Sequence, residues 1–508
     1  MASHDLLDIE DALVSDTNPA QDADNGVLDV QRCVRLHNYL VARGWMAKNH
    51  KQPADLHHLL ARPSYESIHA DQLARVGHKI DPDLRSFLAA IIAPDQERRD
   101  ENPYLFYWVI CVADPDHLVD SEGMYVLDID EDETEDGLPR YVLLYHAVHE
   151  LGGHQIGLVY DQQRRRVALP LATEYLEYVI PADEHEDRWH PLESMLSNWI
   201  EIISVGKIVP DGCDGWRKWD ALDVWRWNPF GSRQVDSAVQ AFDQLTAAIE
   251  ARMPASALLA VDDTADGETR PLFTNAELDT AMVPKVCFAR SLLTRVRTPR
   301  FTIIAPGLEV PHDAAQFAAR QPFTTIPHGN SGDVYVDIDG NGHGDDESNE
   351  LIPPVLIFAA SEKQTVNLYR EFYTPFHPYI DIKSAPTPAG LYSESLKVSE
   401  GQVAGEGFRL ILPFPLREHH AFPERGARTS AGSFVESGSV SELFQHGFFS
   451  FGGDGRAQRI ERLFDRWREL VETGVWTVGE HGVEGSIEKF KDADTDDGWV
   501  HYWIPPSW

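Results

Sequence analysis

Three histidines and one glutamate lie within nine residues, in the segment His-Ala-Val-His-Glu-Leu-Gly-Gly-His at 146–154. His149, Glu150 and His154 form the pattern H-E-x-x-G-H, which is one residue longer than the H-E-x-x-H of common zinc peptidases. Catalytic zinc takes three protein ligands, usually imidazoles or a carboxylate, and keeps a fourth position for water. The spacing therefore indicates a zinc site with His149 and His154 as ligands.

The spacing of these two histidines sets a condition on the backbone. Residues four apart on a regular helix project about 40° apart, whereas residues five apart project about 140° apart. A one-residue bulge would bring His149 and His154 to the same side, and the glycine pair at 152–153 permits such a backbone. The alternative is that the histidines line a turn between two strands, with Tyr145 and Ile156 as core residues.

The same pattern resembles the zinc motif of the dipeptidyl-peptidase III family, over six of the 508 residues. The resemblance implies that His149 and His154 are metal ligands and that Glu150 is the general base. In that family a second helix supplies a glutamate ligand from an E-E-x-x-A-[DE] segment, and this chain has no such segment. The nearest candidate is Glu193, which follows His154 by 39 residues.

This set of residues predicts a metal-dependent hydrolase that acts on an amide or ester bond. A zinc-bound water has its pKa lowered to roughly 7, and Glu150 would accept its proton as the water attacks the carbonyl carbon. His146, or a more distant residue such as His185, would stabilise the oxyanion.

A second group of possible ligands resembles the calcium loop of an EF-hand. Asp337, Asp339, Asn341 and Asp345 occupy positions one, three, five and nine, and Gly342 occupies the sixth, where the loop must turn. Position twelve is a serine instead of the bidentate glutamate, and no flanking helix pair is evident. A solvated acidic turn is the alternative, and a non-enzymatic scaffold with a calcium-binding loop is a third functional hypothesis.

The net charge and the cysteines restrict the partners and the compartment. A formal charge of −38 and a pI of about 4.8 favour neutral or cationic small-molecule or peptide substrates over nucleic acid or anionic membranes. The four cysteines form no C-x-x-C pair, which fits a reducing compartment. No signal peptide and no run of eighteen apolar residues is visible. We therefore expect a cytoplasmic protein without a membrane partner.

The overall character also resembles orphan fungal enzymes of natural-product pathways, among them the arginine-containing cyclodipeptide synthases. That resemblance implies an aminoacyl-tRNA-dependent transferase of secondary metabolism with an acidic D-D-x-x-E motif. The closest strings, at 262–266 and 345–349, do not match this motif. An acidic pocket would suit an arginine substrate, whereas the net charge disfavours tRNA.

Apolar periodicity predicts the elements that position these residues. The strongest amphipathic helices are expected over residues 27–43, 83–92, 191–205, 237–253 and 456–471. Short buried strands are expected over 301–305, 353–359 and 408–414, and a hairpin over 158–169. The apolar run 104–112 fits either a strand or a core helix.

These elements predict a mixed α/β or α+β fold, a multi-layer globular protein with several amphipathic helices packed on short buried strands. Composition divides the chain into four segments. We expect a loose acidic tail over 1–26 and a mainly helical N-terminal domain with the histidine cluster over 27–253. A linker or surface loop would follow over 254–272, and a C-terminal α+β domain over 273–508.

Overall fold

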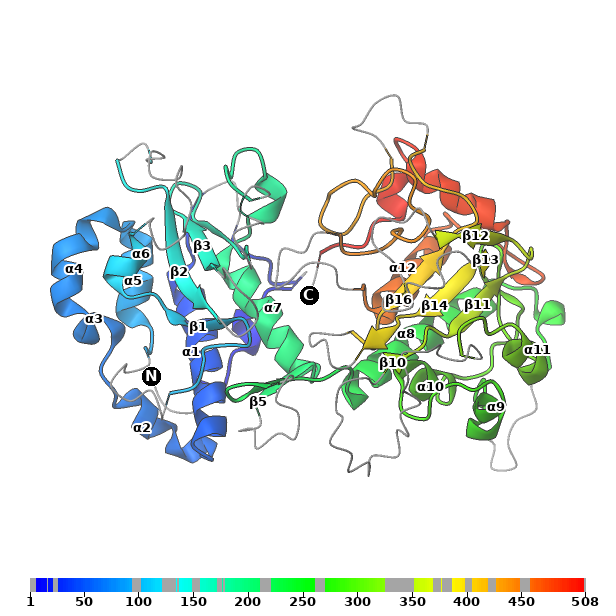
Figure 1. The fold of residues 1–508 in the computed structure, drawn as a ribbon, viewed down its shortest axis with the longest axis horizontal. Coiled ribbons are helices and arrows are strands. Elements are labelled where there is room, and N and C mark those ends of the chain that lie inside the picture. Colours follow the sequence, from blue (N-terminus) through cyan, green and yellow to red (C-terminus); the bar gives the residue numbers. More distant parts are fainter. Residues whose placement is uncertain are drawn as a thin grey trace, which may run out of the picture. The chain divides into compact units, whose positions relative to one another are not determined.

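A computed structural model confirms the mixed α/β class and divides the chain into two compact units (Figure 1). The first unit holds the described residues up to Asn228, and the second holds those from Pro229 onward. The structure describes residues 6–15, 17–21, 26–93, 102–120, 134, 137–148, 156–170, 176, 179–210, 221–260, 270–324, 351–368, 376, 386–397, 404–418, 426–447 and 457–506.

The first unit is built on an antiparallel sheet in the order β1-β2-β3-β4. Its strands are β1 (Val109–Val112), β2 (Tyr141–Ala147), β3 (Gly157–Asp161) and β4 (Arg166–Ala168). Its helices are α1 (Val30–Lys48), α2 (Leu56–Leu60), α3 (Tyr65–Ile68), α4 (Ala70–Val76), α5 (Pro82–Ala90), α6 (Pro115–Leu118) and α7 (Leu192–Ser204). A small second sheet has the order β5-β7-β6, with β5 (Ile208–Pro210), β6 (Ala221–Leu222) and β7 (Trp225–Trp227).

Both faces of the first sheet are covered by apolar residues. One face packs against α1, α5 and α7, and its core includes Leu144 and Tyr145 from β2 and Trp199 from α7. Tyr141 and Leu143 belong to a smaller cluster that also contains Trp189. A register irregularity between Leu143 and Tyr145 explains why two consecutive residues, Leu144 and Tyr145, share one core.

The N-terminal segment corrects one expectation. The sequence predicts a loose tail over residues 1–26, but Leu6, Ile9 and Ala12 are buried in the core of the first unit. The guanidinium of Arg32 donates hydrogen bonds to four backbone carbonyls of this segment, those of Ala12, Leu13, Asn18 and Pro19. The buried apolar side chains and the planar guanidinium of Arg32 therefore hold the described part of the segment against α1.

The second unit contains a seven-stranded sheet in the order β16-β14-β11-β9-β8-β18-β17, in which only β18 and β8 are parallel within the described residues. Its strands are β8 (Ile303–Ala305), β9 (Leu308–Glu309), β11 (Leu356–Ala360), β14 (Gly390–Ser393), β16 (Phe408–Ile411), β17 (Val478–Gly479) and β18 (Gly482–Val483). Two short ladders pair β10 (Leu351–Ile352) with β15 (Leu396–Lys397) and β12 (Thr365–Asn367) with β13 (Pro386–Pro388).

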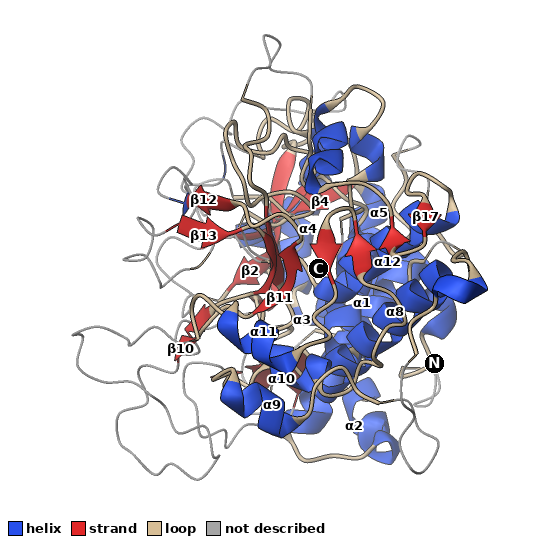
Figure 2. Ribbon diagram, turned by 90° about the vertical axis from the view of Figure 1, so that its right-hand side faces the viewer, coloured by secondary structure: helices blue, strands red, loops and turns tan. Residues whose placement is uncertain are grey.

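Two long helices pack together beside this sheet (Figures 1 and 2). They are α8 (Ser232–Glu250) and α12 (Ile460–Glu472), and Phe242 and Phe464 place their rings 5.5 Å apart between them. The ring of Phe358 on β11 stacks on Phe242, with centroids 6.3 Å apart. The shorter helices are α9 (Asn275–Thr280), α10 (Phe288–Leu293) and α11 (Ala314–Ala319).

The packing of α8 moves the boundary between the units. The sequence places a linker at 254–272, whereas the structure divides the chain between Asn228 and Pro229. The reason is that α8 shares its core with α12, which follows it by more than two hundred residues. In the predicted linker, Leu272 is buried in this core and Leu258 packs against it. The first unit is also less helical than expected, because a sheet forms its centre.

The predicted helices lie within a few residues of the observed ones, and the ambiguous run resolves mostly as irregular structure. Of residues 104–112, only Val109–Val112 form a strand. Pro191 is the N-cap of α7 and not its first helical residue. Among the residues described above, no helix combines the length and the apolar character that a membrane crossing requires.

Candidate functional site at the end of β2

The proposed zinc motif is flanked by two paired strands. His149, Glu150 and His154 lie outside the described residues. On the side before them, Val148 donates its backbone N–H to the carbonyl of Trp108 over 3.0 Å, and Ala147 donates to the carbonyl of Ile156 over 3.4 Å. Val148 and Ile156, the described residues on either side of the motif, therefore lie at the same end of the sheet. Tyr145 and Ile156 are buried, as the alternative of a turn between strands expected for these two residues.

Gly157 makes the close approach of β2 and β3 possible. Its φ is +119°, and a Cβ at this position would lie 2.0 Å from the carbonyl oxygen of Tyr145 and 2.8 Å from the nitrogen of Ala147. Only glycine fits this backbone without displacement of the neighbouring strand. Gly157 is the partner of His146 in the strand register, so it fixes the backbone on which that histidine stands.

His146 is half-buried and lies next to a second histidine that the sequence did not single out. The rings of His117 and His146 have centroids 5.8 Å apart and planes inclined by 74°. His117 comes from α6, which follows β1 after a short turn. Two imidazoles from neighbouring elements thus meet at the end of β2 where the motif begins.

Asp114 fixes the orientation of His117. The carboxylate is the N-cap of α6 and accepts the backbone N–H groups of Asp116 and His117 on Oδ1. Its Oδ2 lies 2.6 Å from Nδ1 of His117, and Gln72 donates to Oδ1 from α4. Because a carboxylate only accepts at neutral pH, Nδ1 carries the proton and Nε2 keeps the lone pair of the neutral ring.

The electrostatics of this pair favour positive charge on the imidazole. The hydrogen bond to Asp114 raises the pKa of His117 above its ordinary value. Burial acts to raise the pKa of Asp114, but the hydrogen bonds from His117 and the backbone outweigh it, and the net shift is downward. A carboxylate in this position stabilises a positive charge on the ring whether a proton or a metal ion supplies it. Sequence reasoning missed the pair, although an N-cap aspartate followed by histidine three residues later was its signal.

Glu193, the predicted third ligand, has other contacts. It is 1% exposed, and its carboxylate accepts from the backbone N–H of Gln21 and from Sγ of Cys33 over 3.6 Å. Burial raises the pKa of Glu193. α7 packs on the face of the sheet that carries Tyr145, whereas strand alternation directs His146 to the opposite face. The described contacts therefore join Glu193 to the N-terminal segment, and its role as a ligand stays a prediction.

The other predicted site residues are those of the calcium loop and His185, the second candidate for stabilising the oxyanion. Asp337, Asp339, Asn341 and Asp345 lie outside the described residues. His185 is half-buried in the turn before the 3-10 helix Glu186–Arg188. Within the described ranges, no group of three or more histidine, cysteine, aspartate or glutamate side chains is arranged to hold a metal ion.

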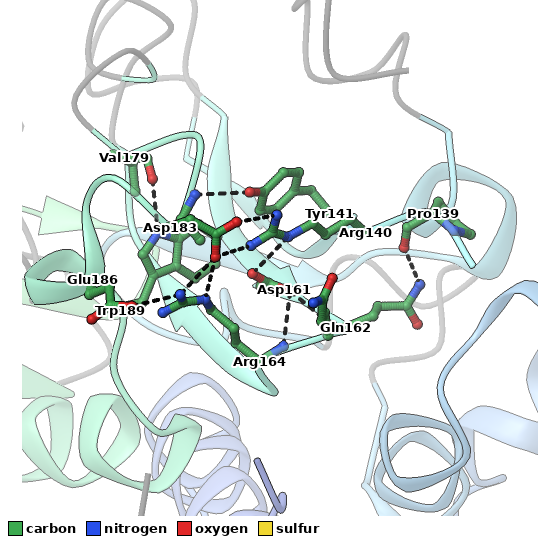
Figure 3. A network of polar contacts seen from close by, with 12 residues as sticks. Pro139, Arg140, Tyr141, Asp161, Gln162, Arg164, Val179, Asp183, Glu186 and Trp189 are labelled. Atoms are coloured by element: carbon green, nitrogen blue, oxygen red, sulfur yellow. Dashed lines mark hydrogen bonds and ion pairs between the residues drawn. The ribbon is translucent and has the colours of Figure 1, made fainter. Parts of the chain in front are cut away.

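A network of charges occupies the other end of β2 and β3 (Figure 3). Arg140 donates both terminal nitrogens to Asp183 over 2.8 and 2.9 Å and its Nε to the fully buried Asp161 over 3.2 Å. Arg164 pairs with Asp183 and Glu186 over 2.7 Å each. The hydrogen bond from Arg140 lowers the pKa of Asp183 to about 2. Each of these charges has an oppositely charged partner, so we assign the network a structural role.

Three arginines of the second unit are also paired with carboxylates. Arg290 bonds Asp279, Arg295 bonds Asp236, and Arg297 bonds Glu250. No protein-family model, curated protein or solved structure matches this chain.

Proposed function

We propose that the protein is a zinc-dependent hydrolase acting on an amide or ester bond of a neutral or cationic substrate. The observation that carries the proposal is the sequence motif of His149, Glu150 and His154, and two further imidazoles, those of His117 and His146, lie at the end of the preceding strand β2. Imidazoles backed by a carboxylate are the donor set that suits zinc. Among the described residues at this end of the sheet, His117 has such a carboxylate in Asp114.

In this proposal each residue has one role. Zinc held by His149 and His154 would supply Lewis acidity and lower the pKa of a water molecule. Glu150 accepts the proton of the attacking water and passes it to the leaving group. His146 stands at the end of β2 beside the motif and would donate a hydrogen bond to the oxyanion. The negative field of the whole chain would favour a cationic substrate.

The decisive measurement is the metal content of the purified chain. We expect about one zinc per wild-type chain and none after His149→Ala. Glu150→Gln should keep the metal but lower the rate of hydrolysis about 10²–10⁴-fold, because it removes only the proton acceptor. His58→Ala, an exposed histidine on α2, is the matched control and should change neither the metal content nor the rate. A wild-type chain without zinc would exclude this function.

A further inference from the structure

The imidazoles of His117 and His146 are close enough to bind one ion between them. A ligating nitrogen lies 2.0–2.1 Å from zinc, which puts each ring centre roughly 3.2 Å from the ion. Two such rings are roughly 5.2 Å apart at a tetrahedral angle and up to roughly 6.4 Å apart when the ion lies on the line between them. The observed separation of 5.8 Å lies between these two values.

Asp114 also orients the ring of His117 for metal binding. Its Nδ1 is occupied by the carboxylate of Asp114 over 2.6 Å, which leaves Nε2 as the nitrogen with a free lone pair. The side chain of His117 is 60% exposed, whereas that of Asp114 is 15% exposed. An accessible imidazole is therefore held by a largely buried carboxylate, which is the arrangement that orients histidine ligands and raises their basicity in metalloproteins.

The carboxylate itself is held from a second element. Gln72 on α4 donates to Asp114 and to Asp116 over 3.1 Å each, and its own oxygen lies 2.6 Å from Nδ1 of His69. These contacts fix the N-cap of α6 against α4. Because the orientation of His117 is set before any ligand arrives, binding would not have to order this side chain.

We propose that His117 and His146 form a binding site for one divalent transition-metal ion, with Asp114 as the positioning residue of His117. Two imidazoles select ions such as zinc, nickel or copper over calcium and magnesium, which prefer oxygen donors. The binding of this ion does not rest on the proposed function: it uses neither His149 nor His154, and it gives His146 a second role beside hydrogen bonding to the oxyanion.

The test uses the full chain with His149→Ala and His154→Ala, which removes the motif ligands and isolates the two described histidines. The probe is Cu²⁺, added to metal-free protein at neutral pH and followed by calorimetry and by the nitrogen hyperfine pattern of its electron paramagnetic resonance. We expect two coordinated imidazoles, and one fewer with at least tenfold weaker binding after His117→Asn.

Two further variants separate this site from general copper binding by histidines. Asp114→Asn keeps a good N-cap but removes the charge behind His117, so the affinity should fall about 10–100-fold while the helix is retained. His57 and His58 form the matched control, because their exposed rings lie 3.9 Å apart and Nδ1 of His57 faces a backbone carbonyl instead of a carboxylate. Substitution of both by asparagine should leave the binding unchanged.

The outcomes distinguish this site from the proposed function. If copper binding is unaffected by His117→Asn, or is lost only with the control pair, the two rings merely touch edge to face and the inference is wrong. If His117→Asn removes copper while the wild-type chain shows neither zinc nor hydrolysis, the site exists and the hydrolase proposal fails. Circular dichroism checks that each variant is folded.

Discussion

At the scale of single residues, His37 shows how burial fixes a protonation state. Its Nε2 lies 3.2 Å from the carbonyl of Ile92, which can only accept, so this nitrogen carries the proton. Nδ1 therefore accepts from the hydroxyl of Tyr145 over 3.0 Å. The neutral ring is satisfied on both sides, and a second proton would displace the tyrosine hydroxyl.

This arrangement predicts sensitivity of the first unit to acid. Burial lowers the pKa of His37, and likewise of His190, from 6.5 to about 4. The unfolded chain binds these protons first, so the stabilisation is complete above pH 6.5 and is lost as the pH falls toward 4. Each shift corresponds to about 3 kcal/mol of unfolding free energy.

The measurement is the protection of α1 amides from hydrogen exchange between pH 7 and pH 4, in the wild type and in His37→Gln. The variant should lose less protection on acidification than the wild type, because glutamine does not titrate. Glu193 works in the opposite direction, since its raised pKa favours the folded state at low pH. Because Glu193 is present in both proteins, its contribution cancels when their losses of protection are compared. Equal losses of protection in the two proteins would contradict the assignment to His37.

In the charge network of Figure 3, replacing aspartate by asparagine should lower the unfolding free energy by different amounts at positions 161 and 183. Asp161→Asn breaks a fully buried ion pair and should lower the unfolding free energy by about 3–5 kcal/mol. Asp183→Asn removes a carboxylate that is 55% exposed, so the expected loss is about 0–1 kcal/mol. Urea denaturation of both variants provides the comparison. Equal losses would show that burial does not govern this network.

At the scale of elements, the N-terminal segment depends on one side chain of α1. Arg32→Ala removes the donors to four carbonyls, and we expect residues 6–21 to become open to limited proteolysis. Arg43→Ala is the matched control, because this arginine stands on the same helix with its guanidinium over the ring of Tyr39. Unchanged cleavage in Arg32→Ala would mean that Leu6 and Ile9 hold the segment without it.

The same scale shows what the sequence predicts and what it does not. Apolar periodicity located α7 and α12, because each buries one stripe against its own unit. Periodicity is local, so it did not reveal that α8 shares a core with α12 instead of with the helices before it. It also missed the approach of His117 to His146, because these histidines come from α6 and from the end of β2, which are distant in the sequence. Such pairings are set by strand register and not by spacing along the chain.

At the scale of the whole molecule, a net charge of −38 makes stability depend on salt. Raising the ionic strength from 0.01 to 0.15 M shortens the screening length from about 30 to about 8 Å and weakens the self-repulsion of the folded chain. We expect the melting temperature at pH 7 to rise by about a few degrees, equally with NaCl and KCl. Near the pI of about 4.8 the same change should have little effect. A melting temperature that falls with added salt at pH 7 would show that attractive ion pairs outweigh the repulsion between like charges.

The docking of the N-terminal segment has a consequence for biosynthesis. Val14 donates its backbone N–H to Oγ of Ser197, and Gln21 donates to the carboxylate of Glu193, across 183 and 172 residues of chain. At roughly 5–20 residues per second, the ribosome releases α7 about 10–40 s after these early residues. During that interval Leu6 and Ile9 lack part of the surface that buries them, so a chaperone that shields emerging apolar side chains would act here.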